Sequence, residues 1–397
     1  MLDPEGRKTE RKVLEVYQKE NPSTYPIELD EKQFQKNRQF AERLYIHSLK
    51  ILPQAFRGAD LLEFGSGTGE RSLNYLLWGA RGTFVEMNEK ALERAKKLYD
   101  HFVPDSEYNL VNSSLFDFES DRKFDITISN GVIHHTPDKE KAFAKQVSHL
   151  KPGGINVLGI GNIGACIQRN LQRFIVYFFA GRDEEEITRV AEDLFTEHLN
   201  RAEKYGGRKR KAIIYDTYVN PKMDFISVSD VLDWYKTYGL RFYSSWPPVT
   251  PPVLADDLAG LTDWRKFPEL LSRPEWIWGT QITMDNDLLV ELDQASASRS
   301  SSFRTLARSL NDVEAENLHP SDVRDSISDV LEAFLEEDRV DVTKIRNFIP
   351  WLHEIDGILA ALEKKSYEDV SKIVKNSSLL FRGKGGMGLT YFAALKE

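Results

Sequence analysis

A short apolar segment that runs directly into a glycine-rich turn constrains the fold of this chain more than any other feature. Residues 60–64 predict a β-strand, Gly-x-Gly-x-Gly follows at 65–69, and residues 70–78 predict a helix. Further strands are predicted at 82–86, 107–111, 124–129, 155–160 and 240–244, with helical segments between most of them. Strands that alternate with helices at this spacing form a parallel sheet covered on both faces, with right-handed crossovers. The sequence therefore predicts a doubly wound α/β core.

The glycine-rich turn also predicts a ligand site. Gly65, Gly67 and Gly69 allow the backbone to turn tightly and to approach a ligand without an intervening Cβ atom. The helix that follows offers unpaired N–H groups at its N-terminus. Taken alone, such a loop could also be a plain turn. Glu86 ends the second predicted strand, 21 residues after Gly65, where a doubly wound nucleotide fold places an acid that accepts hydrogen bonds from ribose hydroxyls.

The charges around the loop indicate what kind of ligand it takes. Dinucleotide sites are typically Gly-x-Gly-x-x-Gly, where the helix dipole faces a pyrophosphate. Here Glu63 precedes the loop and Glu70 follows it. Two acids at these positions favour a ligand that carries a sulfonium and an ammonium group over one that carries phosphates.

Four segments, taken together, resemble the class I S-adenosylmethionine-dependent methyltransferase family. They are LLEFGSGTG at 61–69, VEMN at 85–88, FDITISNGVIHHTPD at 124–138 and LKPGG at 150–154. Their order and spacing match the family over residues 58–160. The resemblance implies a Rossmann-like seven-stranded sheet whose last strand is antiparallel and lies beside the sixth. It also implies S-adenosylmethionine as the cofactor and methyl transfer as the reaction.

The resemblance assigns cofactor-binding roles to individual residues. The residues that would line the methionine end are Glu63, Gly65, Ser66, Gly67 and Gly69. Glu86 would hold the ribose, and Met87 would pack against the adenine.

The chain departs from the family pattern after the third predicted strand. Family members usually carry an aspartate there that binds the adenine amino group, whereas this sequence offers Ser114 or Asn112, with a backbone contact from Leu115. The departure affects the adenine contact and leaves the choice of cofactor unchanged. After the fourth strand, Asn130 and Gly131 would flank the methyl group that is transferred.

His134 and His135 follow at the rim of the same expected pocket. A histidine there can accept the proton of the acceptor, because its pKa is near neutrality. The alternative is that both rings only pack and hydrogen-bond at the entrance of the next helix. Methyl transfer depends mainly on alignment of the reacting atoms, so a dedicated base is not required.

The rest of the chain divides around this core. Residues 1–57 are expected to form a leader and a helix, with an irregular stretch over 1–30, and residues 58–160 the cofactor-binding core. A mostly helical lid at 161–222 is expected to follow, and then a core helix and the sixth strand at 223–246. A helical insertion is expected at 247–377 and the seventh strand at 378–397. The alternative for 247–377 is a separate helical domain. Within it we expect a flexible linker at Ala295–Ser302 and a helix kink at Pro350.

Composition excludes several classes of protein. The single cysteine, Cys166, cannot form an internal disulfide or a cysteine-ligated metal centre, so radical S-adenosylmethionine chemistry is excluded and no metal site is expected. The charged N-terminus does not predict a secretory signal. The apolar run Phe174–Ala180 is too short to span a bilayer and predicts a buried helix, with a membrane-surface face as the alternative. We therefore expect a cytoplasmic protein without a transmembrane segment.

The acceptor is the least constrained part of the prediction. The net charge of −9 and the absence of a recognisable RNA-binding module argue against nucleic acid and favour a small or medium-sized metabolite, such as a sugar or lipid-linked intermediate. The lid carries a basic group that could bind phosphate or could be a solvated helix end: Arg169, Arg173, Lys204, Arg208, Lys209, Arg210 and Lys211. The alternatives are an RNA methyltransferase and a non-catalytic S-adenosylmethionine-binding protein whose helical insertions form a partner surface.

Overall fold

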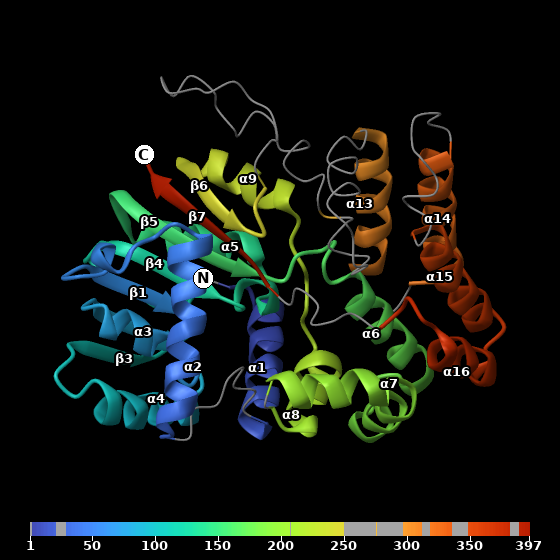
Figure 1. Cartoon of the computed structure of the whole chain (residues 1–397), viewed down its shortest axis with the longest axis horizontal. Coiled ribbons are helices and arrows are strands. Elements are labelled where there is room, and N and C mark those ends of the chain that lie inside the picture. Colours follow the sequence, from blue (N-terminus) through green and yellow to red (C-terminus); the bar gives the residue numbers. More distant parts are fainter. Residues whose placement is uncertain are drawn as a thin grey trace.

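The computed structural model contains a seven-stranded sheet, which lies on the left of Figure 1. The structure describes residues 2–20, 29–206, 208–249, 275, 297–311, 318–335, 348–381 and 389–397. The strands are β1 (Asp60–Phe64), β2 (Arg81–Glu86), β3 (Tyr108–Asn112), β4 (Phe124–Asn130), β5 (Leu150–Ile160), β6 (Leu240–Trp246) and β7 (Thr390–Lys396). Their order across the sheet is β3-β2-β1-β4-β5-β7-β6.

The pairing confirms the predicted topology. β3, β2, β1, β4 and β5 are parallel neighbours, and β7 pairs antiparallel with both β5 and β6. The last strand therefore lies between β5 and β6, with Ala394 opposite Asn156 on one side and Phe242 on the other. The alternating side chains of β7 are buried on both faces of the sheet, as its apolar sequence requires.

Helices cover both faces of the sheet. α3 (Ser72–Leu77) and α4 (Glu89–Phe102) share one hydrophobic core with β1 and β2. α5 (Lys139–Ser148) and α9 (Val228–Thr237) pack on the opposite face against β5, β6 and β7. Ser227 caps α9 in a reciprocal capping box with Asp230, and the helix therefore begins at Val228.

The N-terminal region is helical where the sequence analysis expected an irregular leader. α1 spans Pro4–Lys19, α2 spans Glu31–Glu42, and the π-helix η1 continues α2 over Arg43–Ser48. Asp3 caps α1, Pro4 starts it, and Val13 and Val16 are buried on its inner face. The expectation is therefore wrong for α1, because the capping and packing of one apolar stripe outweigh the polar composition. Pro22 and Pro26 lie outside the described residues.

Two insertions build a helical layer beside the sheet, on the right of Figure 1. The first, between β5 and β6, contains α6 (Ile167–Ala180), α7 (Glu184–Gly206), α8 (Arg210–Ile214) and the π-helix η4 (Tyr215–Val219). The second, between β6 and β7, contains α13 (Ala297–Asn311), α14 (Pro320–Leu335), α15 (Phe348–Glu363) and α16 (Tyr367–Asn376). One hydrophobic core joins both, through Leu171, Leu194, Leu306, Val330, Leu359 and Val374.

This shared core explains two expectations that were wrong. Residues from Ala297 onward are not a linker but the start of α13, which buries Phe303, Leu306 and Leu310 at helical spacing. Packing of that stripe outweighs the modest helix propensity of the serines. Pro350 does not kink a helix, because it lies in the first turn of α15, where a backbone N–H donor is not needed. The parts of the expected insertion at 250–274 and 276–296 lie outside the described residues.

The apolar run of α6 is part of the same core. Phe174, Ile175 and Val176 are buried, and the aromatic residues after them pack partly against the core. Cys166, just before α6, is also buried, and burial raises the pKa of its thiol to about 11. Among the described helices, none has both the length and the apolar character needed to cross a membrane.

Candidate functional site

The carboxyl ends of β1, β2 and β4 meet at one edge of the sheet, and the predicted site residues lie there. The glycine loop Gly65–Gly69 follows β1, Glu86 ends β2, and Asn130 ends β4. Because these strands are parallel neighbours, residues that are distant in the sequence arrive at the same edge of the sheet, where ligands bind in folds of this kind.

The three positions of the loop require glycine for different structural reasons. All three have positive φ, at +70° for Gly65, +55° for Gly67 and +85° for Gly69. A Cβ atom at Gly65 would lie 2.2 Å from Val132 Cγ2, and one at Gly69 would lie 2.7 Å from Ala95 Cβ. A Cβ atom at Gly67 would meet nothing within 4 Å. The outer two glycines are therefore fixed by packing, whereas Gly67 faces open space where a ligand can approach.

The Glu86 carboxylate lies against the tip of this loop. Its two oxygens accept the backbone N–H groups of Gly67, at 3.0 Å, and of Asn88, at 2.8 Å. Burial raises the pKa of Glu86, while these N–H donors act in the opposite direction. The Asn112 side chain donates to the carbonyl oxygens of Glu86 and Met87, both at 3.1 Å, and so fixes the backbone behind the carboxylate. The Asn112 side-chain nitrogen therefore already donates to the protein backbone.

Glu63 is a second buried carboxylate near the loop. It is 2% exposed and accepts a hydrogen bond from the Ser72 hydroxyl at the start of α3. Burial raises the pKa of Glu63 to about 7, although Ser72 and the positive charge of Arg71 lower it. The hydroxyl of Ser66 is buried without a hydrogen-bond partner among the described residues. The loop region thus combines acids with unused polar atoms.

An arginine and several aromatic side chains complete one wall, and the sequence analysis did not identify them. The guanidinium of Arg71 lies 5.5 Å from the ring centre of Tyr391 and 5.7 Å from that of Phe40. The Tyr75 hydroxyl accepts from the Asn130 side chain at 3.2 Å and contacts the Tyr45 hydroxyl at 2.7 Å. The position of Arg71 directly after Glu70 could have indicated its role. The sequence carries no comparable sign for Tyr391, which reaches the site only through β7.

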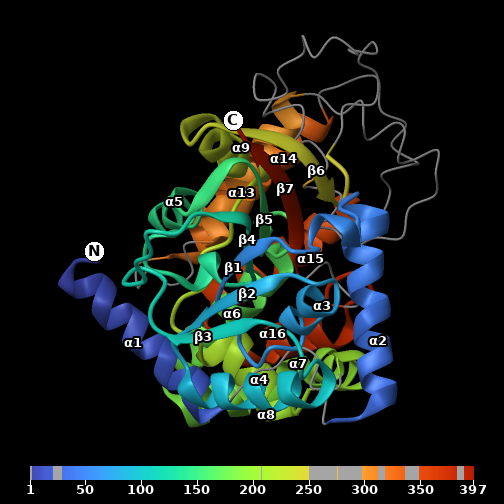
Figure 2. The ribbon, with the colours of Figure 1, turned by 90° about the vertical axis from the view of Figure 1, so that its left-hand side faces the viewer.

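Helix α1 lies over the part of the site that follows β2 and β3 (Figure 2). The Ser114 hydroxyl donates to the carboxylate of Glu10, and the Asn88 side chain donates to the carbonyl oxygen of Tyr17 at 3.1 Å. Met87 and Leu115 are half-buried in the same region. Helix α1 therefore supplies residues next to the positions expected to hold the adenine. The sequence did not indicate this contribution, because an irregular leader was predicted where α1 lies.

His134 and His135 lie in a 3₁₀ turn after β4, in different environments. His134 is buried, and its Nδ1 accepts the backbone N–H of Gly161 at 3.2 Å. Burial lowers the pKa of both rings, and for His134 to well below its usual range. His135 Nδ1 lies 2.8 Å from the Lys222 carbonyl oxygen and 3.2 Å from the Asn220 side-chain nitrogen. Because a carbonyl oxygen can only accept, the shorter contact favours the proton on Nδ1. His135 therefore presents Nε2 as an acceptor, whereas the Nδ1 of His134 is already used. Gly131, before this turn, has φ of +77° and faces Leu389.

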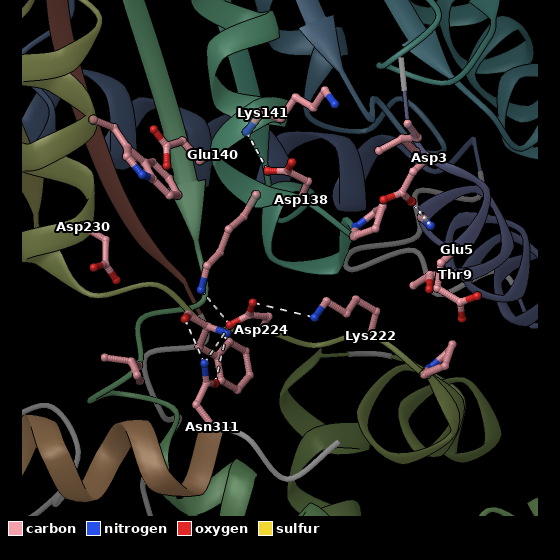
Figure 3. A pocket seen from close by; sticks show the side chains of 18 of the residues that line it. Asp3, Glu5, Thr9, Asp138, Glu140, Lys141, Lys222, Asp224, Asp230 and Asn311 are labelled. Carbon is pink, nitrogen blue, oxygen red and sulfur yellow. Dashed lines mark hydrogen bonds and ion pairs between the residues drawn. The ribbon is translucent and has the colours of Figure 1, made fainter. Parts of the chain in front are cut away.

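A cavity of about 1000 Å³ lies between the N-terminal end of α1, the start of α5 and the C-terminal end of α13 (Figure 3). Phe225 lines it, and its ring centre is 5.8 Å from that of His134. At its centre the Asp224 carboxylate binds Lys139 at 2.7 Å and the Asn311 amide at 2.8 Å. None of the predicted cofactor-binding residues lines this cavity. The charged side chains that line the cavity largely pair with one another, and these pairs connect the core to the insertions.

Comparisons with known proteins find a methyltransferase domain in this chain. A family model described as a methyltransferase domain matches residues 62–156. Lovastatin nonaketide synthase from Monascus pilosus is 29% identical over 110 residues, which cover 26% of this chain and 4% of the synthase. An uncharacterised protein from Synechococcus sp. is 24% identical over 230 residues, covering 52% of this chain and 55% of that protein. The chain thus spans about half, or much less, of the length of the curated relatives it matches.

Two of the solved structures that resemble part of this chain are of methyltransferases. The N-methyltransferase NodS from Bradyrhizobium japonicum, in complex with S-adenosylhomocysteine, has 20% identity and a TM-score of 0.29, covering 41% of this chain and 76% of NodS. Magnesium protoporphyrin IX methyltransferase from Synechocystis has 12% identity and a TM-score of 0.34, covering 60% of this chain and 86% of the enzyme. The family model identifies residues 62–156 as a methyltransferase domain, and the strand order places this domain in a Rossmann-like sheet whose last strand is antiparallel.

Proposed function

We propose that this chain is a methyltransferase that moves a methyl group from S-adenosylmethionine to an oxygen or nitrogen atom of a small or medium-sized metabolite. The observation that carries the proposal is the position of the Glu86 carboxylate, held at the end of β2 against the open face of Gly67 within the matched domain. An acid there is suited to the two ribose hydroxyls, and the open face leaves room for the ligand.

The residues present fit S-adenosylmethionine. Glu63 would attract its ammonium group, and Arg71, whose buried Nη1 has no hydrogen-bond partner among the described residues, would take its carboxylate. Gly65, Ser66, Gly67 and Gly69 would line the methionine end. Met87, Ser114 and Leu115, under α1, would surround the adenine, while Asn130 and Gly131 would lie beside the reacting methyl group.

Bound S-adenosylmethionine supplies an electrophilic methyl group. The contribution of the chain is to align the acceptor with that group and to exclude water. Of the two histidines, His135 is the better candidate to take the acceptor's proton, because the Lys222 carbonyl holds its Nδ1–H and leaves Nε2 as a base. We assign to His134 the structural role of fixing the backbone at Gly161.

Contacts between α1 and the first insertion support a small acceptor. Lys19 binds Glu184 at 2.7 Å, Lys211 binds Glu20 at 2.8 Å, and the Asn220 amide donates to the Tyr17 hydroxyl at 3.1 Å. These contacts join α1 to the insertion at 161–222 across the site. A site bridged in this way favours a metabolite that can be enclosed over a long polymer, and it gives the insertion the role of a lid.

The test is methyl transfer from labelled S-adenosylmethionine into a cell extract that is afterwards separated into metabolites, RNA and protein. We expect label in the metabolite fraction and none with Gly67→Arg, which fills the open face of the loop while its Cβ meets no other atom. Label in RNA would support an RNA methyltransferase instead. Tight cofactor binding with no transfer into any fraction would support a non-catalytic binding protein.

Cofactor affinity should depend on pH through Glu63. Since burial raises the pKa of Glu63 to about 7, this carboxyl is increasingly protonated as the pH falls below 7 and loses its attraction for the ammonium group of the ligand. The Kd for S-adenosylhomocysteine should therefore rise as pH falls, by up to about tenfold per pH unit. Calorimetry between pH 5.5 and 8.5 measures this. Glu63→Gln should bind more weakly at pH 8 and show a flatter profile, and a wild-type Kd that is constant over the range would contradict the assignment.

A further inference from the structure

The basic group predicted in the first insertion consists of Arg169, Arg173, Lys204, Arg208, Lys209, Arg210 and Lys211, and the structure gives its members different surroundings. Four of them are committed to protein groups: Arg173 to the Thr217 and Asn220 carbonyls, Arg208 to Asp216, Arg210 to Glu203 and Lys211 to Glu20. Lys204 and Lys209 are exposed. Arg169 differs from all of these. It is half-buried, and its guanidinium makes no hydrogen bond or ion pair within the described ranges.

Arg169 lies on the side of α6 that faces the η4 region. It lies in the first turn of α6 and one helical turn before Arg173, so both side chains project from the same face of the helix. Arg173 is fully buried and donates to carbonyl groups of the η4 region, 2.8 Å from the Thr217 oxygen. That anchor fixes how α6 is rotated. Arg169 therefore projects from the face of α6 that lies against the η4 region.

The electrostatics of neighbouring groups agree with this placement. Burial is the main cause of the lowered pKa of His134 and His135, and the positive charge of Arg169 lowers both pKa values further. Burial raises the pKa of Asp216, but the charges of Arg208, His135 and Arg169 outweigh it and hold the pKa below its usual value. Arg169 thus acts on both histidines and on a carboxylate that Arg208 already binds at 2.9 Å.

We propose that Arg169 binds an anionic group of the methyl acceptor, a carboxylate or a phosphate, and so positions the acceptor beside His135. The proposal rests on the proposed function. A guanidinium that is withdrawn from water gains most from a planar or tetrahedral oxyanion, which it can bind through two parallel hydrogen bonds.

One partly buried cation fits a single anionic group better than a polymer. Binding along an RNA backbone uses several exposed lysines and arginines at once, whereas the neighbours of Arg169 are already paired with protein carboxylates and carbonyls. The acceptor class is therefore an anionic metabolite with one carboxylate or phosphate near the atom that is methylated.

Two measurements test the assignment, with Arg169→Gln, Arg169→Lys and the control Arg189→Gln, which removes an exposed arginine that pairs with Glu186 in α7. In the first, metabolites are divided by anion exchange before incubation with labelled S-adenosylmethionine. We expect wild type to label the anionic fraction and Arg169→Gln to reduce that labelling about 10- to 100-fold, as for loss of a charged hydrogen bond. Arg169→Lys should be intermediate, Arg189→Gln should match wild type, and S-adenosylhomocysteine affinity should stay within about twofold in all variants, because Arg169 is assigned to the acceptor.

In the second, inorganic phosphate is titrated while the histidine ring signals are followed by NMR. Phosphate should shift the His135 signals of wild type and of Arg189→Gln but not those of Arg169→Gln. Labelling confined to the neutral fraction, or equal labelling by Arg169→Gln and wild type, would overturn the assignment. Absence of label from every fraction would contradict the proposed function instead, and the phosphate titration, which needs no methyl transfer, would then decide the anion site by itself.

Discussion

S-adenosylhomocysteine binding should weaken by at least about 100-fold when Glu86 is replaced by alanine, because each hydrogen bond from a ribose hydroxyl to an ionised carboxylate contributes about 1.5–3 kcal/mol. The same carboxylate also accepts the N–H groups of Gly67 and Asn88, so its loss frees the tip of the loop as well. Isothermal titration calorimetry measures the effect directly.

The matched control is Glu89→Ala, an exposed acid in the first turn of α4. It removes the same charge three residues later in the chain and should leave affinity within about twofold, because an exposed charge at this distance is screened by solvent. Thermal unfolding of both variants shows whether the sheet is intact. Retention of affinity within about fivefold in a folded Glu86→Ala protein would contradict the ribose role of this residue.

Replacement of Gly65 by alanine should be the most damaging single-methyl change in the loop. Its φ of +70° costs an L-residue about 1–2 kcal/mol, and overpacking adds about 1–3 kcal/mol because the new Cβ would lie 2.2 Å from Val132 Cγ2. We expect the free energy of unfolding, measured in urea, to fall by about 2–5 kcal/mol, the sum of these two costs.

Gly67→Ala separates the two causes. Its φ of +55° imposes the backbone cost, but its Cβ meets no atom within 4 Å, so destabilisation should stop at about 1–2 kcal/mol while cofactor affinity falls. Val132→Ala in the Gly65→Ala background should recover part of the lost stability by removing the two methyl groups that clash. Equal destabilisation by Gly65→Ala and Gly67→Ala would show that contact with Val132 is not what fixes Gly65.

The sequence predicted the core well because the core is encoded locally. The strand before Gly65, the glycines and the acid at the end of β2 each follow from the periodicity or conformational preference of a few consecutive residues. The parallel order then follows from general rules on crossover connections. The antiparallel direction of β7 was predicted from the family resemblance, and the structure confirms it.

Predictions from local composition were wrong where distant packing decides the conformation. The serine-rich residues at the start of α13 form a helix because Phe303 and Leu306 face a core contributed by the other insertion. The polar segment α1 is a helix because Val13 and Val16, on one face of it, are buried against the rest of the domain. In both segments the free energy that fixes the helix comes from contacts with residues far away in the sequence.

The same distinction applies to the candidate site. By itself the sequence determined the residues that follow strand ends, because a glycine loop and the acids around it act through backbone geometry and charge that a short segment contains. Only the tertiary structure brought Arg71 to Tyr391, Ser114 to Glu10 of α1, and Arg169 toward His135, and only it showed which basic residues of the insertion already have partners. Such pairings join segments that are distant in the chain, and their geometry arises when those segments pack.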